Sequence, residues 1–224
     1  MKKNFYTIKM KLSVCLLVIM TCLGTVANAQ TTLSAGDIAF TGYNSNDAGS
    51  LQNDFSFVLL TNISAGTTIT LTDNGYKAGA GLGTTEGTLV WSSTTAMARY
   101  TQVYIQVNTT GNGITGLSAG SIAGGFSNFI LTTAGDQVLA YQGSSVSPIF
   151  ISAIHMNSDP AATQGAWDNM ASGTPLTGNR SDVPLGLISG STCVAPDPNI
   201  GTSEKDNGVF NAMNKGIKSP PEIL

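Results

Sequence analysis

The sequence predicts an all-β fold, namely an Ig-like or jelly-roll-like β-sandwich with at most one or two short helices. Three observations predict it. Thr, Val, Ile and aromatic residues recur in short runs bounded by Gly, Asn and Ser, a composition that favours strands joined by turns. The runs follow one another near the spacing of about 8–12 residues that is typical of sandwiches and barrels. Several runs alternate apolar and polar residues, which predicts strands with one buried face.

The strand candidates differ in how many faces they are expected to bury. Thr67–Thr72 and Thr101–Val107 alternate, whereas Phe55–Thr61 becomes continuously apolar and predicts burial on both faces. Pro160–Met170 is the one helix-length stretch, and Gly165 weakens it. The main strand candidates are Asp37–Tyr43, Phe55–Thr61, Thr67–Thr72, Gly87–Ser92, Thr101–Val107, Asn128–Thr132, Gln137–Tyr141 and Ile149–Ile154, and the weaker ones are Gly186–Ser189, Thr192–Ala195 and Gly208–Asn211.

A short pattern, an apolar residue followed by Ser-Ala-Gly, recurs along the chain. It begins at Leu33, Ile63 and Leu117, and a looser copy, TTAG, begins at Thr132. Glycine adopts positive φ at little cost, so we expect a recurrent turn whose glycine is left-handed, placed just before a strand. Four residues per copy favour shared turn chemistry over tandem duplication.

The chain start predicts export. Residues 1–29 combine a Lys-rich start, the apolar run Leu12–Met20 and the cleavage signature Ala27-Asn28-Ala29, which together predict a signal peptide. The run is shorter than the roughly 20 apolar residues of a membrane span, so no transmembrane segment is expected after cleavage. Lipoprotein processing at Cys22 is the alternative, and Thr21 fits it poorly. The expected location is secreted, extracellular or at the cell surface.

Residues 30–211 are expected to form the β-sandwich, and 212–224 a poorly ordered tail that is the truncated end of the domain. The end of the chain motivates the second expectation. Ser219 and Glu222 form a capping box with Pro220 at the first helical position, but almost no helix can follow. A helix this short is unstable because nucleation costs more than one turn returns.

Charge and cysteine content exclude some classes of function. The predicted mature chain has six basic and thirteen acidic residues, a net charge of −7, and its basic residues are scattered. Nucleic-acid binding requires clustered Lys and Arg, so no nucleic-acid partner is expected. Cys193 is the one cysteine after the signal peptide, so no internal disulfide can form and the core must supply the stability.

The order of several motifs resembles that of a known module. AGDIAFTGYNSN, DFSFVLL, ISAGTTITLTDNGY, EGTLVW, AGDQVLAYQGS, GAWDN, PLGLISGST and DNGVFN follow in this order, so the chain resembles a β-rich N-terminal module of large secreted or surface bacterial proteins of Bacteroidetes and cyanobacterial type. The resemblance spans residues 33–218. The chain is also similar to lamin-tail-type Ig-like domains in its F-V-L-L-x-N and AGTTI-x-LTDNG segments. The resemblance implies no catalytic residue, and hydrolase, repeat or sorting domains commonly follow the module.

The candidate catalytic residues do not form a recognisable site. His155 is the single histidine, closes an apolar strand and favours a structural role over that of a base or metal ligand. No G-x-S-x-G elbow accompanies it, so a Ser-His-Asp triad is disfavoured. Paired carboxylates for glycoside hydrolysis remain arithmetically open, but most Asp residues stand in turn-forming contexts. We therefore expect a protein that is not an enzyme.

Calcium is the one candidate cofactor, and no other is indicated. Asp73-Asn74 and Asp206-Asn207 each begin an Asp-Asn-Gly tripeptide, and oxygen-rich corners suit a hard cation. The same tripeptide also forms tight turns without any metal, and no EF-hand pattern is present.

Two aromatic residues are candidate ligand contacts. Trp167 is flanked by Gly, Asn and Asp, and with Tyr76 it could stack on a sugar; the competing interpretation is that it packs its loop onto the sheet edge. The favoured hypothesis is a non-enzymatic secreted or cell-surface module with a structural or adhesive role, the N-terminal part of a larger exported protein. The alternatives are a carbohydrate-binding accessory module and, disfavoured, a secreted hydrolase. The expected partners are a polysaccharide or a cell-surface protein.

Overall fold

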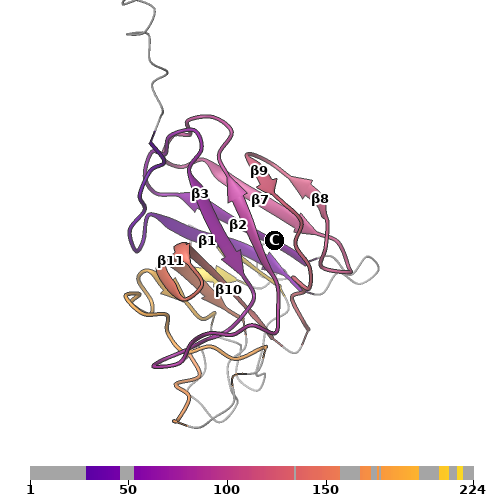
Figure 1. Ribbon diagram of the computed structural model, residues 1–224, viewed down its shortest axis with the longest axis vertical. Helices are drawn as coiled ribbons and strands as arrows, with labels where there is room; N and C mark the ends of the chain where they lie inside the picture. Colours follow the sequence, from indigo (N-terminus) through magenta and orange to yellow (C-terminus); the bar gives the residue numbers. More distant parts are fainter. Residues whose placement is uncertain are drawn as a thin grey trace, which may run out of the picture.

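The computed structural model describes residues 29–45, 53–133, 135–156, 167–172, 176, 178–196, 207–211 and 216–218. Over these residues the fold is all-β and contains no helix, so the predicted fold class is confirmed. Two six-stranded sheets pack against each other, and a two-stranded ribbon accompanies them (Figure 1).

The first sheet is antiparallel throughout. Its first strand in the sequence pairs with a strand from the end of the described chain. Its order is β14 (Gly216–Lys218), β13 (Asn207–Asn211), β1 (Ile38–Asn44), β2 (Asn53–Leu59), β7 (Gln102–Val107) and β8 (Ile114–Leu117).

The second sheet is antiparallel except for the pair β11–β12, which is parallel. Its order is β12 (Cys193–Val194), β11 (Ser147–His155), β10 (Gln137–Ser144), β3 (Thr68–Thr72), β6 (Thr88–Ser92) and β9 (Ser121–Ala123). The ribbon consists of β4 (Tyr76–Lys77) and β5 (Gly81–Leu82).

The main core lies between the two sheets and follows the predicted alternation. In β7, the apolar residues Val103, Ile105 and Val107 are fully buried, and the residues between them point to the other face. Phe57 of the first sheet meets Trp91 of the second edge to face, with ring centroids 5.5 Å apart. Full burial of a Phe side chain contributes about 1.5–3 kcal/mol, so these rings are major terms in holding the sheets together.

The recurrent turn is confirmed. The glycines of the four copies, Gly36, Gly66, Gly120 and Gly135, have φ values of +89°, +80°, +82° and +84°. In the first two copies the backbone N–H that follows the glycine donates to the Ser carbonyl three residues earlier, at 3.0 and 3.2 Å. This geometry is a type II turn, which requires positive φ at its third residue and therefore favours glycine.

Some elements differ from the prediction. Asn128–Thr132 is not a strand. The ring of Phe129 is instead fully buried against Phe55, and its backbone N–H donates to the Gly111 carbonyl. Gly186–Ser189 is likewise not a strand. Strands β4, β5, β8, β9 and β14 were not predicted, since they are short and their positions are set by their neighbours.

The chain ends bear on three further expectations. Residues 216–218, inside the expected tail 212–224, form β14 on the edge of β13, because an edge strand offers unpaired backbone groups to a further strand. The rest of that tail and residues 1–28 of the predicted signal peptide lie outside the described residues. In the expected helix, Trp167–Met170 is not helical and the remainder is outside the described residues. No described helix is long and apolar enough to cross a membrane.

The two sheets differ in what lies on their outer faces. Part of the second sheet is covered by the described residues between Trp167 and Thr192, here called the covering segment, and by the β4–β5 ribbon. Together they form a second apolar cluster, comprising Tyr76, Leu139, Tyr141, Phe150, Ala153, Trp167, Leu187 and Cys193. The outer face of the first sheet instead has exposed or half-buried polar residues, among them Thr41, Gln102 and Gln106.

Candidate functional site

Buried carboxylates gather at one end of the second sheet. Asp73 directly follows β3, and Asp136 directly precedes β10. Because β3 and β10 are antiparallel neighbours in which Thr72 pairs with Leu139, the end of one strand lies beside the start of the other. Asp73, Asp136 and Gln137 are all fully buried. The topology thus brings together residues that are more than sixty positions apart in the sequence.

The side chain of Gln137 links this end of the sheet to the covering segment. Its Nε2 donates to the backbone carbonyls of Asp73 and Gly178 and lies 3.2 Å from Asp136 Oδ1. Asp136 Oδ1 also accepts the Gln137 N–H at 2.8 Å, and Oδ2 accepts the Thr132 N–H at 2.9 Å. Asp136 is therefore well bonded by backbone donors.

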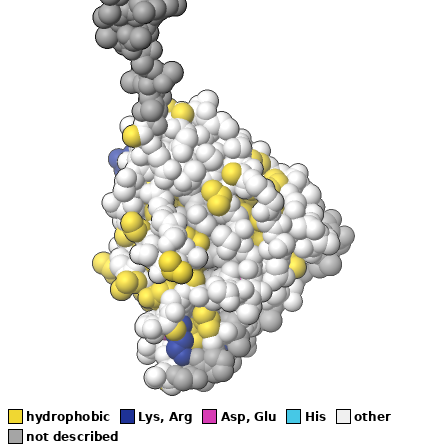
Figure 2. Space-filling view, viewed as in Figure 1, with side chains coloured by type: hydrophobic (Ala, Val, Ile, Leu, Met, Phe, Trp, Pro, Cys, Tyr) yellow, Lys and Arg dark blue, Asp and Glu magenta, His cyan; other side chains and the backbone are white. Residues whose placement is uncertain are grey.

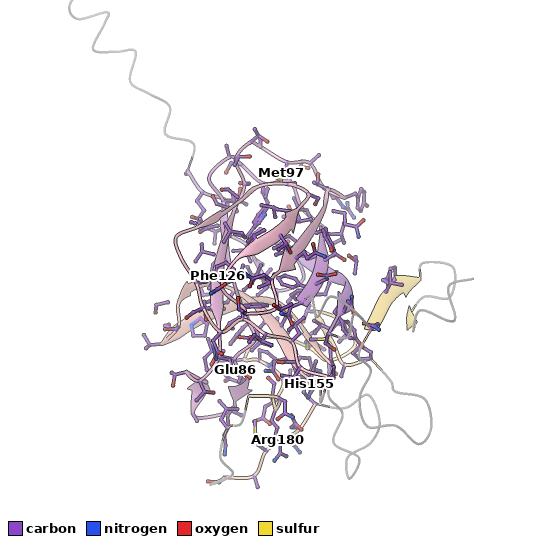
Figure 3. All side chains as sticks on the ribbon, turned by 90° about the vertical axis from the view of Figure 1, so that its right-hand side faces the viewer. Glu86, Met97, Phe126, His155 and Arg180 are labelled. Carbon is purple, nitrogen blue, oxygen red and sulfur yellow. The ribbon has the colours of Figure 1, made fainter. Side chains whose placement is uncertain are left out.

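Glu86 enters the same centre from the loop before β6. Its carboxylate lies against Gly178, where a Cβ atom would overlap it, so the glycine permits the close approach. Glu86 is half-buried, and Thr84 and Thr85 next to it are exposed, which leaves this side of the centre near solvent. Figure 3 shows Glu86 and His155 at a similar level, toward the end of the molecule opposite Met97.

Burial and like charge raise the pKa values of these three acids. Burial first, and then the negative charge of Glu86, raise the pKa of Asp73 to about 8, and backbone N–H groups, that of Ile130 foremost, oppose the rise. Burial raises the pKa of Glu86 to about 7. Burial, followed by the charges of Glu86 and Asp73, raises the pKa of Asp136 well above its usual range. The carboxylates are thus close enough to disfavour one another's ionisation.

Three oxygens of the centre accept no hydrogen bond from the described residues. They are Asp73 Oδ1, Glu86 Oε2 and Gln137 Oε1, and all three are buried. The other Asp73 oxygen, Oδ2, accepts the Ile130 N–H at 2.8 Å. Buried acceptors normally have a donor or a cation, so these oxygens call for a physical explanation.

His155 lies beside this centre, and both of its ring nitrogens are engaged. Nδ1 is 3.2 Å from the Asp136 carbonyl, and Nε2 is 3.1 Å from Asp168 Oδ2. The ring stacks on Trp167 at 5.2 Å and is 1% exposed. Each ring nitrogen thus lies within hydrogen-bond distance of a protein oxygen, and the buried ring presents neither nitrogen to solvent.

Asp168 fixes the position of His155 from the covering segment. Its Oδ2 also accepts the Ser181 N–H at 2.6 Å, and its Oδ1 lies 3.5 Å from Arg180 Nε. The Asp168 side chain is 1% exposed, whereas that of Arg180 is 32% exposed. The arrangement anchors the covering segment to β11.

The residues predicted to bind calcium fall in two places. The Asn74 side chain is used in local hydrogen bonds. Its Nδ2 donates to Thr72 Oγ1 at 3.0 Å and to the Gly87 carbonyl at 3.1 Å. Its Oδ1 accepts the Glu86 N–H at 3.0 Å. Asn207 pairs with Asn44 in the first sheet, whereas Asp73 and Asn74 follow a strand of the second. Asp206 lies outside the described residues. The sequence missed Glu86, Asp136 and Gln137 as neighbours of Asp73, since only the strand order brings them together.

The two predicted aromatic contacts are buried. Trp167 is 5% exposed and Tyr76 is 8% exposed, and the Tyr76 ring packs edge-on against Phe150 at 5.2 Å. Both belong to the second apolar cluster. Their role as ligand contacts stays a prediction, and buried rings offer no free face on which a sugar could stack.

The outer face of the first sheet has an exposed aromatic residue that the sequence did not single out. Tyr104 is 37% exposed and borders a depression of about 170 Å³, lined by Gly42, Tyr43, Asn44, Asp54, Phe55, Ser56 and Tyr104. The alternation of β7 was the available signal, because it places Tyr104 between Gln102 and Gln106 on the polar face. In Figure 1, β1, β2 and β7 lie toward the viewer, and the same view in Figure 2 is largely polar.

Polar side chains connect neighbouring strands across this face. Thr41 Oγ1 and Ser56 Oγ are 2.8 Å apart, and Gln102 Nε2 donates to Thr41 Oγ1 at 3.1 Å. On the same face, Thr115 Oγ1 donates to Gln106 Oε1 at 3.1 Å, and Gln106 Nε2 donates to Asp54 Oδ2 at 3.4 Å. We call this set the polar ladder.

Comparisons with known proteins identify no relative. The chain matches no protein-family model, no curated protein and no solved structure. Within the described part of the chain, no group of three or more His, Cys, Asp or Glu side chains is arranged to hold a metal ion.

Proposed function

We propose that this chain is a non-enzymatic β-sandwich module of an exported protein, secreted or at the cell surface, with a structural or adhesive role. The observation that carries the proposal is the outer face of the first sheet, whose polar ladder includes exposed and half-buried side chains among the described residues. The ladder spans β1, β2, β7 and β8 and contains one charged residue, Asp54. A broad polar face held rigid by a sandwich is suited to contact with another surface.

The contrast between the two sides of the sandwich supports this proposal. Asp73, Asp136 and His155 are buried, and the hydrogen bonds of Asp136 and His155 go to backbone groups and to Asp168. A general base must reach the proton that it removes, and His155 is 1% exposed with both nitrogens engaged. The polar ladder instead consists of amides and hydroxyls together with the single carboxylate of Asp54.

Carbohydrate binding is the second candidate, and one observation favours it. Tyr104 borders the depression together with Asn44 and Asp54, so an exposed aromatic ring stands beside amide and carboxylate groups. Sugars are bound by stacking on aromatic faces and by hydrogen bonds to such polar groups. This candidate moves the proposed contact from Trp167 and Tyr76 to Tyr104.

Binding of the mature chain to polysaccharides and to cell surfaces tests both candidates. The decisive variant is Tyr104→Ala, and the matched control is Tyr100→Ala. Tyr100 is 65% exposed but lies at the turn before β7, with Arg99 over its ring. We expect Tyr104→Ala to reduce binding at least about tenfold, the effect of losing about 1.4 kcal/mol, and Tyr100→Ala to leave it unchanged.

The outcomes separate the hypotheses. Binding to a defined glycan that depends on Tyr104 supports the carbohydrate-binding candidate, and Tyr104-dependent attachment to cells alone supports the adhesive role. Equal binding by both variants rules out this face as the contact. Hydrolysis of ester or glycoside substrates by the wild-type chain, lost in His155→Phe, would contradict the non-enzymatic proposal.

A further inference from the structure

We propose that the oxygen-rich centre formed by Asp73, Glu86, Gln137 and the carbonyl of Gly178 is a calcium site that joins the covering segment to the second sheet. The inference goes beyond the proposed function and does not depend on it. It retains Asp73 from the residues that the sequence indicates, and it replaces the others with residues that only the fold brings close.

The centre contains more acceptors than hydrogen-bond donors. The Gln137 amide nitrogen has two hydrogens, yet it faces three oxygens: the carbonyls of Asp73 and Gly178, and Asp136 Oδ1. Asp73 Oδ1, Glu86 Oε2 and Gln137 Oε1 add three more acceptors with no donor among the described residues. A cation satisfies several such oxygens at once, which no single hydrogen-bond donor can do.

The oxygens of this centre are buried, which makes a missing partner costly. Asp73 and Gln137 are fully buried, and the Gln137 amide points into the centre, since it bonds to the Asp73 carbonyl. A buried acceptor left without a partner is costly, and a charged one more so. Glu86 brings a second carboxylate into this buried centre, since it lies against Gly178, whose carbonyl accepts from Gln137 Nε2. A divalent cation would offset both charges.

The ligand chemistry points to calcium. The available atoms are two carboxylates, a side-chain amide and backbone carbonyls, which are the hard oxygen ligands that Ca²⁺ takes in sets of six to eight. Zinc prefers thiolate and imidazole, and the neighbouring His155 has both nitrogens engaged. Magnesium requires a stricter octahedral arrangement. Asp136 accepts the N–H groups of Thr132 and Gln137, and its Oδ1 lies next to the Gln137 amide, so it would help to position that ligand.

The centre is placed where a cation could enter. Glu86 is half-buried beside the exposed Thr84 and Thr85, so its carboxylate marks the solvent side. Gly178 belongs to the covering segment, whereas Asp73 and Gln137 belong to the second sheet. A bound cation would therefore connect the covering segment to the second sheet. Two carboxylates among neutral oxygens suit a weak site, with a Kd of about 10⁻⁴–10⁻³ M as in extracellular calcium modules.

The test is calcium titration of the full chain after chelation and dialysis, followed by calorimetry and thermal melting. At about 10 mM Ca²⁺, a site of this affinity should raise the Tm by about 3–10 °C, and Mg²⁺ should raise it less. Glu86→Gln removes one ligand charge at nearly constant size and should abolish the shift. Asp54→Asn, which removes one carboxylate charge from the first sheet, is the matched control and should keep the shift.

A second variant guards against a simple loss of folding. Glu86→Asp keeps the carboxylate charge on a shorter side chain and should retain a calcium-dependent rise in Tm, whereas a variant that had only lost its fold would show none. Absence of binding heat and of a Tm shift in the wild type would overturn the proposal and leave protons on the carboxyls as the neutralising species. An equal shift in wild type and Glu86→Gln would overturn it as well, by placing any calcium elsewhere.

Discussion

The outer faces of the two sheets show what a cover does to otherwise similar strands. In β10, residues Gln137–Gln142 are buried without interruption, because the inner face meets the main core and the outer face meets the covering segment. In β7, buried and accessible residues alternate along the strand. Both strands contain Gln and Tyr, so the difference comes from what lies on top and not from composition.

The comparison also explains where the polar chemistry of the molecule is concentrated. A polar side chain on the open face can bond to water, and the polar ladder is therefore free to form or break locally. Under the cover, the same kind of side chain must find a protein partner or pay the full cost of desolvation. Gln137, His155 and Asp168 accordingly form the buried interactions that hold the covering segment.

The largest effect is expected from Phe150→Ala. Phe150 is 3% exposed on the covered face, where its ring packs against Tyr76 at 5.2 Å and Tyr141 at 6.0 Å. Removing the ring should lower the free energy of unfolding by about 3–5 kcal/mol, as measured by chemical denaturation. Val146→Ala in the same hairpin is the control, since Val146 is 92% exposed, and it should change stability by less than about 0.5 kcal/mol. Equal effects would mean that the cover does not pack on β11.

A smaller effect is expected from His155→Phe. Phenylalanine can keep the stacking on Trp167 but loses the contacts to the Asp136 carbonyl and Asp168 Oδ2. The free energy of unfolding should fall by about 1–3 kcal/mol. Arg180→Gln removes the more exposed partner of Asp168 and should cost less than about 1 kcal/mol. A negligible effect of His155→Phe would show that the imidazole adds no net stability to the cover.

The thiol of Cys193 should make stability depend on alkaline pH. Burial in the second cluster raises the pKa of Cys193 from about 9 to about 12. Above about pH 9 the thiol ionises in the unfolded chain but not in the folded one, so the unfolded state gains and stability falls. By about pH 10 the wild type should lose about 1 kcal/mol more than Cys193→Ala, relative to neutral pH. Parallel profiles of the two proteins up to that pH would indicate that the thiol is accessible when folded.

The smallest effect is expected on the open face. Gln102→Ala removes the bond from Gln102 Nε2 to Thr41 Oγ1, and water can take its place. The free energy of unfolding should change by less than about 0.5 kcal/mol in denaturant titrations. A loss above about 1 kcal/mol would contradict the idea that this face contributes little to stability, and would show that the polar ladder is part of the scaffold.

The strands and turns that depend on neighbouring residues could be predicted from the sequence. The alternation in β3 and β7 and the turns at Gly36 and Gly66 depend on neighbouring residues, and they were predicted correctly. The covering segment was not predicted, because its short connections have no hydrophobic periodicity. The polar neighbours of Trp167 left open whether it is exposed or packs its loop onto the sheet edge, because its burial depends on β11, which is distant in the sequence.

The site shows the same division. Asp73 was identified from its own tripeptide, but nothing in the sequence singled out Asp136, because burial beside β3 is a property of strand order. Glu86 has no local signal at all, since its neighbour Gly178 is 92 residues further along the chain. Sequence can therefore indicate oxygen-rich corners, whereas only the topology says which of them meet.

The pairing of β1 with β13 has a consequence for how this chain folds during synthesis. β1 occupies an interior position in the first sheet, and its neighbour on one side is made from residues 207–211. Bonds such as Leu33 N–H to Gln142 Oε1 and Tyr76 N–H to Ser181 Oγ, 109 and 105 residues apart, also join early to late segments. Such long-range contacts slow folding, and a nascent chain that stops short of residue 207 exposes the backbone edge of β1. A chaperone that holds the chain until residues 207–211 emerge would therefore protect it from edge-to-edge aggregation.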